Sequence, residues 1–224
     1  MPRIQYDFPS ESDLQREIRS HRRGIVKETF LRCWRSYKDG AWLSDELARV
    51  TGSGNMAYGG WATTLVDSLD TLLILGLMQE FKDATKASTS LDFAWSHEAE
   101  ISTFGTNIRY LGAFLAAYDL SGDHALLYKA IEVGELLLAA FDTPSHLPVA
   151  KFRWQEAASG AIQNTSFTTI AELGSYSLEF THLSQVTGDM RFYDASLRGI
   201  QLKTSLPGMW PQDLDARCPV HRNA

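Results

Sequence analysis

The sequence lacks the features that mark several common classes of protein. It holds only two cysteines, Cys33 and Cys218, among 224 residues, too few for a disulfide framework or an all-cysteine zinc site. Its most apolar stretch, residues 72–78, is far shorter than the roughly 20 residues that cross a bilayer. The N-terminus has no apolar segment of the kind that a secretory signal peptide needs. As written, the chain is expected to carry no transmembrane segment and no secretory signal.

Basic charge is also scarce. Lysine and arginine number 21 against 27 aspartates and glutamates, which leaves a net charge of −6. Nucleic-acid binding usually needs a broad basic surface, so we expect no nucleic-acid partner. The motifs of serine hydrolases, zinc proteases and P-loop proteins are absent, and the six histidines show no metal-ligand spacing. Carboxylates and arginines inside apolar segments remain as the candidates for chemistry.

Apolar residues recur at helical spacing along most of the chain and predict an all-α protein. A glycine-rich loop at 51–60, a polar loop at 142–164 and a turn at 206–211 interrupt the pattern. The expected helices cover residues 13–38, 61–77, 79–87, 104–118, 123–141, 166–186 and 189–202.

One short pattern occurs twice. LSGD at 120–123 and VTGD at 186–189 each combine the end of a helix, a glycine that stops it and an aspartate that caps the next one. The two aspartates lie 66 residues apart. The repeat fits two helical hairpins of one architecture. It also fits the bland explanation that Gly-Asp is a common connector between helices.

Five charged residues stand in otherwise apolar helical segments. Asp67 and Asp70 share a helix face, where they form either a structural network or the wall of a carboxylate-lined cavity. Arg109 needs an anion or access to solvent. Glu172 and Glu179 are two turns apart, roughly 10 Å along one face. That face suits a polyhydroxylated ligand, whose hydroxyls donate to carboxylates, and equally suits buried salt bridges.

Four segments carry a family resemblance, in the same order as in the family. They read AWLSDEL (41–47), GWATTLVDSLDTLLILGL (60–77), NIRYLGAFLAAYDLSGD (107–123) and AELGSYSLEFTHLSQVTGD (171–189). Together they resemble the class I α-mannosidases, the inverting α-1,2-mannosidases of glycoside hydrolase family 47, which trim mannose from N-linked glycans. The resemblance covers about residues 24–216. Residues 1–23 would then be an N-terminal extension and 217–224 an unrelated tail.

The resemblance implies an all-α (α/α)7 barrel, of which this chain would form about half, with roughly seven helices in hairpins. It also implies a sugar site in the central cavity and a high-mannose N-glycan or glycoprotein as partner. The family uses Ca²⁺, whose protein ligand would lie outside this chain, so no metal ligand is expected here. Family members work in the endoplasmic reticulum and Golgi or are secreted, whereas this chain shows no signal for that route.

The resemblance further implies which side chains bind substrate. Arg109 matches an arginine that lines the family's mannose site, and Asp67 and Asp70 match paired aspartates near the cavity. Glu172 and Glu179 fall in a segment that supplies a substrate-contacting carboxylate.

The chain departs from the family at the catalytic position. Gly105 stands where the family's F-E-x-x-I-R motif has a glutamate with a proposed acid role, and Leu43 stands where the family has glycine. Inverting hydrolysis needs one carboxyl group to protonate the leaving oxygen and a second to activate water. The family domain is also about twice as long. We therefore expect no intact catalytic residue and no activity of this chain on its own.

Two alternatives stay open at this point. Beside an inactive member of the family, the chain could be a non-catalytic glycan-binding or regulatory pseudoenzyme, or the product of a decayed or incomplete gene. A half barrel leaves apolar hairpin edges exposed, so self-association through these edges is expected.

Overall fold

The computed structural model describes residues 6–158, 167–200 and 213–215. Three short antiparallel strand pairs connect the loops of the described chain. They are β1 (Glu46–Leu47) with β2 (Gly54–Asn55), β3 (Ile101–Ser102) with β4 (Lys151–Phe152), and β5 (Phe167–Thr169) with β6 (Asp213–Asp215). Most of the described chain is helical. The helices are α1 (Asp13–Ala41), α2 (Thr63–Asp67), α3 (Leu69–Ile74), α4 (Met78–Ser88), α5 (Thr103–Thr106), the π-helix η1 (Asn107–Leu111), α6 (Gly112–Ser121), α7 (His124–Ala139), α8 (Trp154–Ala158), α9 (Ile170–Gly174), α10 (Tyr176–Thr187) and α11 (Met190–Ile200).

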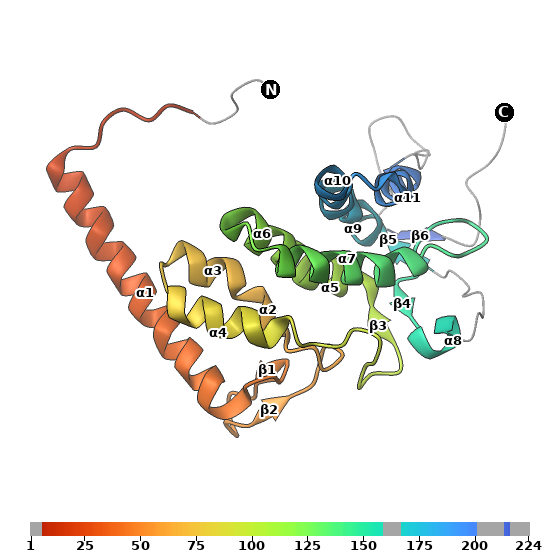
Figure 1. The fold of residues 1–224 in the computed structure, drawn as a ribbon, viewed down its shortest axis with the longest axis horizontal. Coiled ribbons are helices and arrows are strands. Elements are labelled where there is room, and N and C mark those ends of the chain that lie inside the picture. Colours follow the sequence, from red (N-terminus) through yellow and green to blue (C-terminus); the bar gives the residue numbers. More distant parts are fainter. Residues whose placement is uncertain (1–5, 159–166, 201–212, 216–224) are drawn as a thin grey trace.

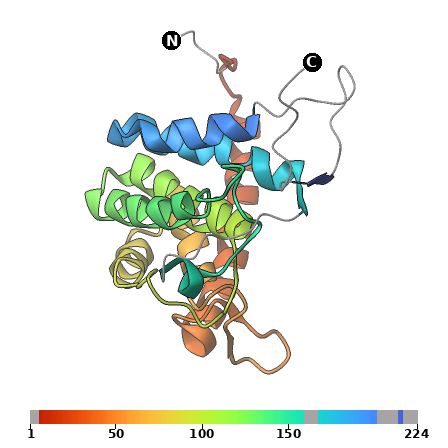
Figure 2. The ribbon, with the colours of Figure 1, turned by 90° about the vertical axis from the view of Figure 1, so that its right-hand side faces the viewer.

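Helices α6 and α7 form the centre of the molecule (Figure 1). Helices α3 and α4 pack on one side of them and the α10–α11 pair on the other, so that the hairpins stack as layers when the molecule is turned (Figure 2). The side chains between the layers are fully buried leucines and aromatics, each worth about 1.5–3 kcal/mol of stability. The largest of them are Tyr110, Tyr176, Phe114, Phe180, Phe192, Leu65, Leu69, Leu72, Leu111, Leu115, Leu126 and Leu137.

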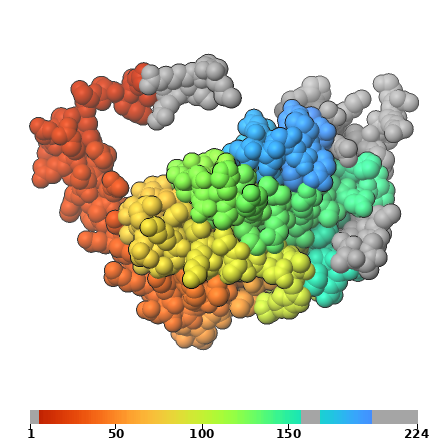
Figure 3. Space-filling view, viewed as in Figure 1, coloured from red at the N-terminus to blue at the C-terminus, as the bar shows by residue number. Residues whose placement is uncertain are grey.

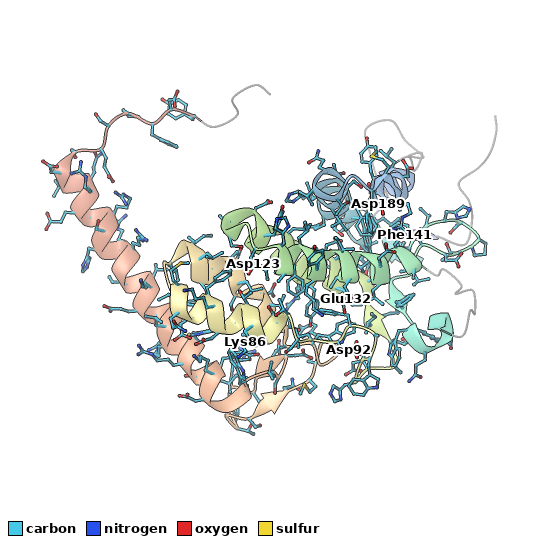
Figure 4. The ribbon with its side chains drawn as sticks, viewed as in Figure 1. Lys86, Asp92, Asp123, Glu132, Phe141 and Asp189 are labelled. Carbon is cyan, nitrogen blue, oxygen red and sulfur yellow. The ribbon has the colours of Figure 1, made fainter. Side chains whose placement is uncertain are left out.

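The repeated Gly-Asp pattern marks two equivalent hairpins. Gly122 and Gly188 end α6 and α10 in the left-handed conformation, with φ of 70° and 77°. Asp123 and Asp189 each accept a hydrogen bond from the backbone N–H two residues further on, at 2.9 and 3.0 Å. Figure 4 labels both aspartates, at the turns that lead into α7 and α11. Each pattern joins two helices that pack against each other, α6 with α7 and α10 with α11, and the caps fit both explanations of the repeat.

The helix predicted over 61–77 is two helices. Ala62, with φ of 53°, precedes α2, and Ser68 separates α2 from α3. The Ser68 hydroxyl donates to the carbonyl oxygen of Thr64 at 2.6 Å, a local bond that competes with regular helix geometry. The apolar periodicity continues across this break, which explains why the sequence pattern did not reveal it.

The helix predicted over 166–186 is also wrong at its start. Residues Phe167–Thr169 form β5, and α9 begins only at Ile170, where Thr169 caps it. Within the loop predicted at 142–164, strand β4 and helix α8 occur. The turn predicted at 206–211, Cys218 and the tail at 217–224 lie outside the described residues.

Leu43, which departs from the resembled family's glycine, has a φ of 65°. A side chain with a Cβ atom is disfavoured in this left-handed region by about 1–2 kcal/mol. The position therefore suits glycine, and the leucine here is strained. Among the described helices, none is long and apolar enough to cross a membrane.

Candidate functional site

Arg109 is the centre of a charged cluster at the surface. It lies in the π-helix η1, a widened helical turn of a kind often found at functional sites. Its guanidinium carbon lies 4.4 Å from the ring centre of Tyr58, and its Nη1 atom lies 3.6 Å from Oδ2 of Asp67. The Arg109 and Asp67 side chains are 35% and 41% exposed, so a ligand in solvent can reach both charges.

Asp67 has an unusual acidity. The pKa of its carboxyl group is raised to about 6, chiefly because the surrounding protein removes it from water; Arg109 lowers this pKa and the charge of Asp70 raises it by smaller amounts. Asp70 itself accepts a hydrogen bond from the Thr71 hydroxyl at 3.2 Å. Ser68 breaks the helix between the two aspartates, and their shared place beside a cavity stays a prediction.

A buried carboxylate holds the loop that carries Tyr58. Asp45 is completely buried, and its carboxylate accepts hydrogen bonds from the backbone N–H groups of Tyr58 (2.7 Å), Gly60 (2.8 Å) and Thr63 (3.3 Å). The Tyr110 hydroxyl donates to the Tyr58 carbonyl at 3.0 Å. These bonds fix the loop so that the Tyr58 ring lies under Arg109. Sequence reasoning assigned no role to Tyr58 or Asp45; the only signal was that Asp45 belongs to the AWLSDEL segment.

A cavity of about 240 Å³ lies beside this cluster, and Gly105 forms part of its wall. The Gly105 N–H donates to Oγ of Ser102 at 3.1 Å. A Cβ atom added at Gly105 would meet only the Ser102 side chain, at 3.4 Å, so packing does not require glycine here. The other lining residues are Ala57, Tyr58, Gly59, Glu98, Glu100, Ile101, Thr106, Tyr110 and Lys151.

The carboxylates of the two predicted glutamates accept hydrogen bonds from other residues of the protein. One carboxylate oxygen of Glu172 accepts hydrogen bonds from the Thr168 hydroxyl (3.0 Å) and the Thr169 N–H (2.8 Å), which completes a capping box at the start of α9. Glu179 accepts a hydrogen bond from the buried Asn107 amide at 2.8 Å. Neither glutamate forms an ion pair with Arg109. Their contact with substrate stays a prediction.

Clusters of typical metal-binding side chains were sought among the described residues. Nowhere in residues 6–158, 167–200 and 213–215 do three or more histidine, cysteine, aspartate or glutamate side chains gather closely enough to hold a metal ion. Hard cations such as Ca²⁺ need six to eight oxygen ligands, and no part of the chemistry below depends on one.

Comparison with known proteins decides the family. The sequence model of Glycosyl hydrolase family 47 matches residues 29–222. The chain belongs to this family. The rat endoplasmic reticulum mannosyl-oligosaccharide 1,2-alpha-mannosidase is 41% identical over 174 residues, which make up 77% of this chain and 26% of the rat protein. The Arabidopsis thaliana mannosyl-oligosaccharide 1,2-alpha-mannosidase MNS1 is 40% identical over 181 residues, 78% of this chain and 31% of the plant protein.

A solved structure supports the same assignment. The alpha-1,2-mannosidase from Trichoderma reesei superimposes with a TM-score of 0.80 at 28% identity, over 88% of this chain and 45% of that chain. The predicted fold class is confirmed: the protein is all-α and forms part of the (α/α)7 barrel of family 47. These relatives are named as mannosidases, so the family resemblance supports a glycosidase. The chain spans less than half the length of these relatives.

Proposed function

We propose that this chain binds terminal mannose of high-mannose N-glycans at the cluster of Arg109, Asp67 and Tyr58, as part of an α-1,2-mannosidase-type barrel, and that on its own it does not hydrolyse them. The observation that carries the proposal is the position of Arg109, half-exposed, held by an aromatic ring and a carboxylate beside an open cavity. The rat relative is named an endoplasmic reticulum enzyme, so the glycan would be met in the secretory pathway.

The chemistry of the cluster suits a sugar. A sugar hydroxyl both donates and accepts hydrogen bonds. Arg109 offers planar N–H donors, and Asp67 offers an acceptor that receives no hydrogen bond from any other described residue. Asp70, close enough to raise the pKa of Asp67, adds a second acceptor. Glu172, whose carboxylate is taken up by its own capping box, has no part in this proposed site.

The lack of hydrolysis follows from Gly105. Inverting cleavage places a carboxylic acid near the leaving oxygen, and glycine supplies no such group. Glu100, which also lines the cavity, already bonds the Arg153 guanidinium at 2.7 Å. No catalytic residue is therefore assigned in this chain, and Ca²⁺, expected for the family, is assigned no ligand here.

Two assays test the halves of this proposal separately. Purified protein is incubated with a high-mannose glycan, with and without Ca²⁺, and released mannose is measured; no release is expected. Clear Ca²⁺-dependent release would contradict the claim of inactivity. Calorimetric titration with α-1,2-linked mannobiose should give a binding signal. No heat at millimolar ligand would contradict glycan binding and would favour a decayed gene product.

Exposed apolar side chains support the proposal that the chain self-associates. Ile74 on α3 and Leu178 on α10 are largely exposed at the edges of the stacked hairpins. Sedimentation velocity should therefore show dimers or larger species at high protein concentration. A monomer with one sharp, cooperative thermal transition would contradict this.

A further inference from the structure

Arg109 lies in a helical turn that is wider than an α-helical one. In η1 the Gly112 N–H donates to the carbonyl oxygen of Asn107, five residues earlier, whereas an α-helix closes over four residues. If this turn closed to regular α-helix, the side chains in and before it would rotate by up to about 100° relative to α6, the angle that one residue covers. The direction of Arg109 therefore depends on whatever keeps η1 wide.

Glu179 on α10 lies against both ends of this turn. Its Oε2 atom accepts a hydrogen bond from the side-chain amide of Asn107 at 2.8 Å. Its Oε1 atom would lie 3.7 Å from a Cβ atom built on Gly112. Asn107 and Gly112 are the two residues whose backbone groups close the π-helical turn. One carboxylate from another helix therefore spans the bond that defines η1.

The Asn107 side chain depends on this contact. Asn107 is completely buried, and its Oδ1 atom has no hydrogen-bond partner among the described residues. A hydrogen bond to an ionised acceptor is about twice as strong as one between neutral groups. Loss of the Glu179 carboxylate would leave both polar atoms of a buried side chain unpaired, which is costly unless η1 changes shape.

The packing of α10 brings Glu179 to this place. Helix α10 contacts both η1 and α6, and Figure 3 shows the green surface of α6 and the blue surface of the α10–α11 pair in contact on the visible face. In the described part of the chain Glu179 forms no ion pair with Arg109, whose carboxylate partner at 3.6 Å is Asp67. The route from Glu179 to the Arg109 cluster therefore runs through Asn107.

We propose that Glu179 is a positioning residue, which keeps η1 in its π-helical form by holding Asn107. In this form η1 directs Arg109 toward Tyr58 and Asp67. This role is distinct from contact with the sugar, and the two predict different results. The orientation of Arg109 is a property of the free protein, whereas its consequence for glycan affinity rests on the proposed function.

Nuclear magnetic resonance of the full chain, isotope-labelled at arginine, tests the positioning without any ligand. The Tyr58 ring, 4.4 Å from the Arg109 guanidinium, displaces the resonances of this side chain, which Arg109→Lys identifies by their loss. Glu179→Ala should abolish the displacement. Glu179→Gln, which keeps an oxygen acceptor for the Asn107 amide, should retain it.

Glu172→Ala is the matched control. It removes a carboxylate of the neighbouring helix that is bound at the start of α9, and it should leave the Arg109 resonances in place. Arg109 resonances that Glu179→Ala leaves unchanged would overturn the proposal. An equal change in Glu172→Ala would also overturn it, because a general loss of stability would then explain both.

Calorimetric titration with α-1,2-linked mannobiose measures the consequence for binding. Glu179→Ala should weaken binding at least about fivefold, and so should Asn107→Leu, which removes the amide but keeps its volume and serves if the alanine variant does not fold. The double variant should be no weaker than either single one, because both remove the same contact. Glu179→Gln should stay within about twofold of the wild type.

Two results of this titration would overturn the proposal. Equal losses in Glu179→Ala and Glu179→Gln, or full affinity in Asn107→Leu, would mean that Glu179 contacts the sugar itself. If the wild type gives no heat while the Arg109 resonances respond as expected, the proposed function fails and the positioning of Arg109 by Glu179 stands.

Discussion

Asp67 and Glu172 both interrupt apolar helical segments, and their carboxylates end in contrasting surroundings. Glu172 accepts hydrogen bonds from Thr168 and Thr169 and so completes the start of its own helix. Asp67 accepts none from the described residues; it faces Arg109 across 3.6 Å and has a raised pKa. A carboxylate already bound by its own backbone stabilises the fold, whereas one that lacks donors gains most from a ligand. A carboxylate within an apolar helical segment therefore caps a helix at Glu172, whereas at Asp67, beside η1, we propose that it binds a ligand.

The largest expected effect on stability comes from Asp45, which holds the loop that carries Tyr58. Asp45→Ala leaves several buried N–H donors without an acceptor and should lower the free energy of unfolding by about 3 kcal/mol. Urea denaturation measures this loss. Asp39→Ala, at an exposed position on α1, is the control and should change it by less than about 0.5 kcal/mol. Similar values for both variants would mean that Asp45 does not hold the Tyr58 loop.

Removal of the Glu172 carboxylate tests whether it acts only as a helix cap. Glu172→Ala removes the capping box and should lower the free energy of unfolding by about 1 kcal/mol, while glycan affinity stays unchanged. Glu172→Gln, which also suits a capping box, should lose less stability. Unfolding curves and calorimetric titrations give both quantities. A marked loss of glycan affinity in the glutamine variant would place Glu172 in the sugar site and remove the contrast.

The aromatic support of Arg109 should have a smaller effect. Tyr58→Leu removes the ring beneath the guanidinium and should weaken glycan binding about two- to fivefold, in line with a cation–π contribution of about 0.5–1 kcal/mol. Titration of Tyr128→Leu, at an exposed tyrosine on α7, serves as the control. Equal affinities for the Tyr58 variant and the wild type would show that the ring does not position Arg109.

The smallest expected effect is the pH dependence of Asp67. Its pKa in the folded protein, about 6, exceeds the ordinary 3.8, so the unfolded chain loses this proton first as pH rises. As the pH rises from 3.8 to about 6, Asp67 therefore lowers the free energy of unfolding progressively. Above a pH of about 6 the loss is complete and stays constant. Because the side chain is 41% exposed, solvent screening keeps the cost below about 1 kcal/mol.

Asp67→Asn removes this cost. The variant should be slightly more stable than the wild type at neutral pH, and the difference should vanish below the ordinary pKa. Thermal unfolding of both proteins across this range measures it, with Asp39→Asn, at an exposed position on α1, as the control. A difference that is constant with pH would contradict the raised pKa.

Much of this fold was predictable from the sequence. Apolar periodicity located most of the helices, and the Gly-Asp pairs located the hairpin turns, because both depend on local spacing. The start of α9 was missed because Phe167–Thr169 pairs with residues far along the chain. The break at Ser68 was missed because it does not change the apolar pattern.

The candidate site was predictable only in part. Arg109 and Asp67 were identified as charges in apolar surroundings, and the structure brings them together. Tyr58 could not be assigned, since its contact with Arg109 depends on a loop that Asp45 folds from a distance. Whether Glu172 caps a helix or lines a cavity could not be decided from spacing, because both uses place a carboxylate near the start of a helix.

The most direct test of the central claim is the affinity of the Arg109→Ala variant for α-1,2-linked mannobiose, measured by calorimetry beside the wild type and Glu172→Gln. We expect a loss of at least about tenfold for the arginine variant, the size expected when a charged hydrogen-bonding partner is removed, and no loss for Glu172→Gln. Wild-type affinity in Arg109→Ala would contradict it.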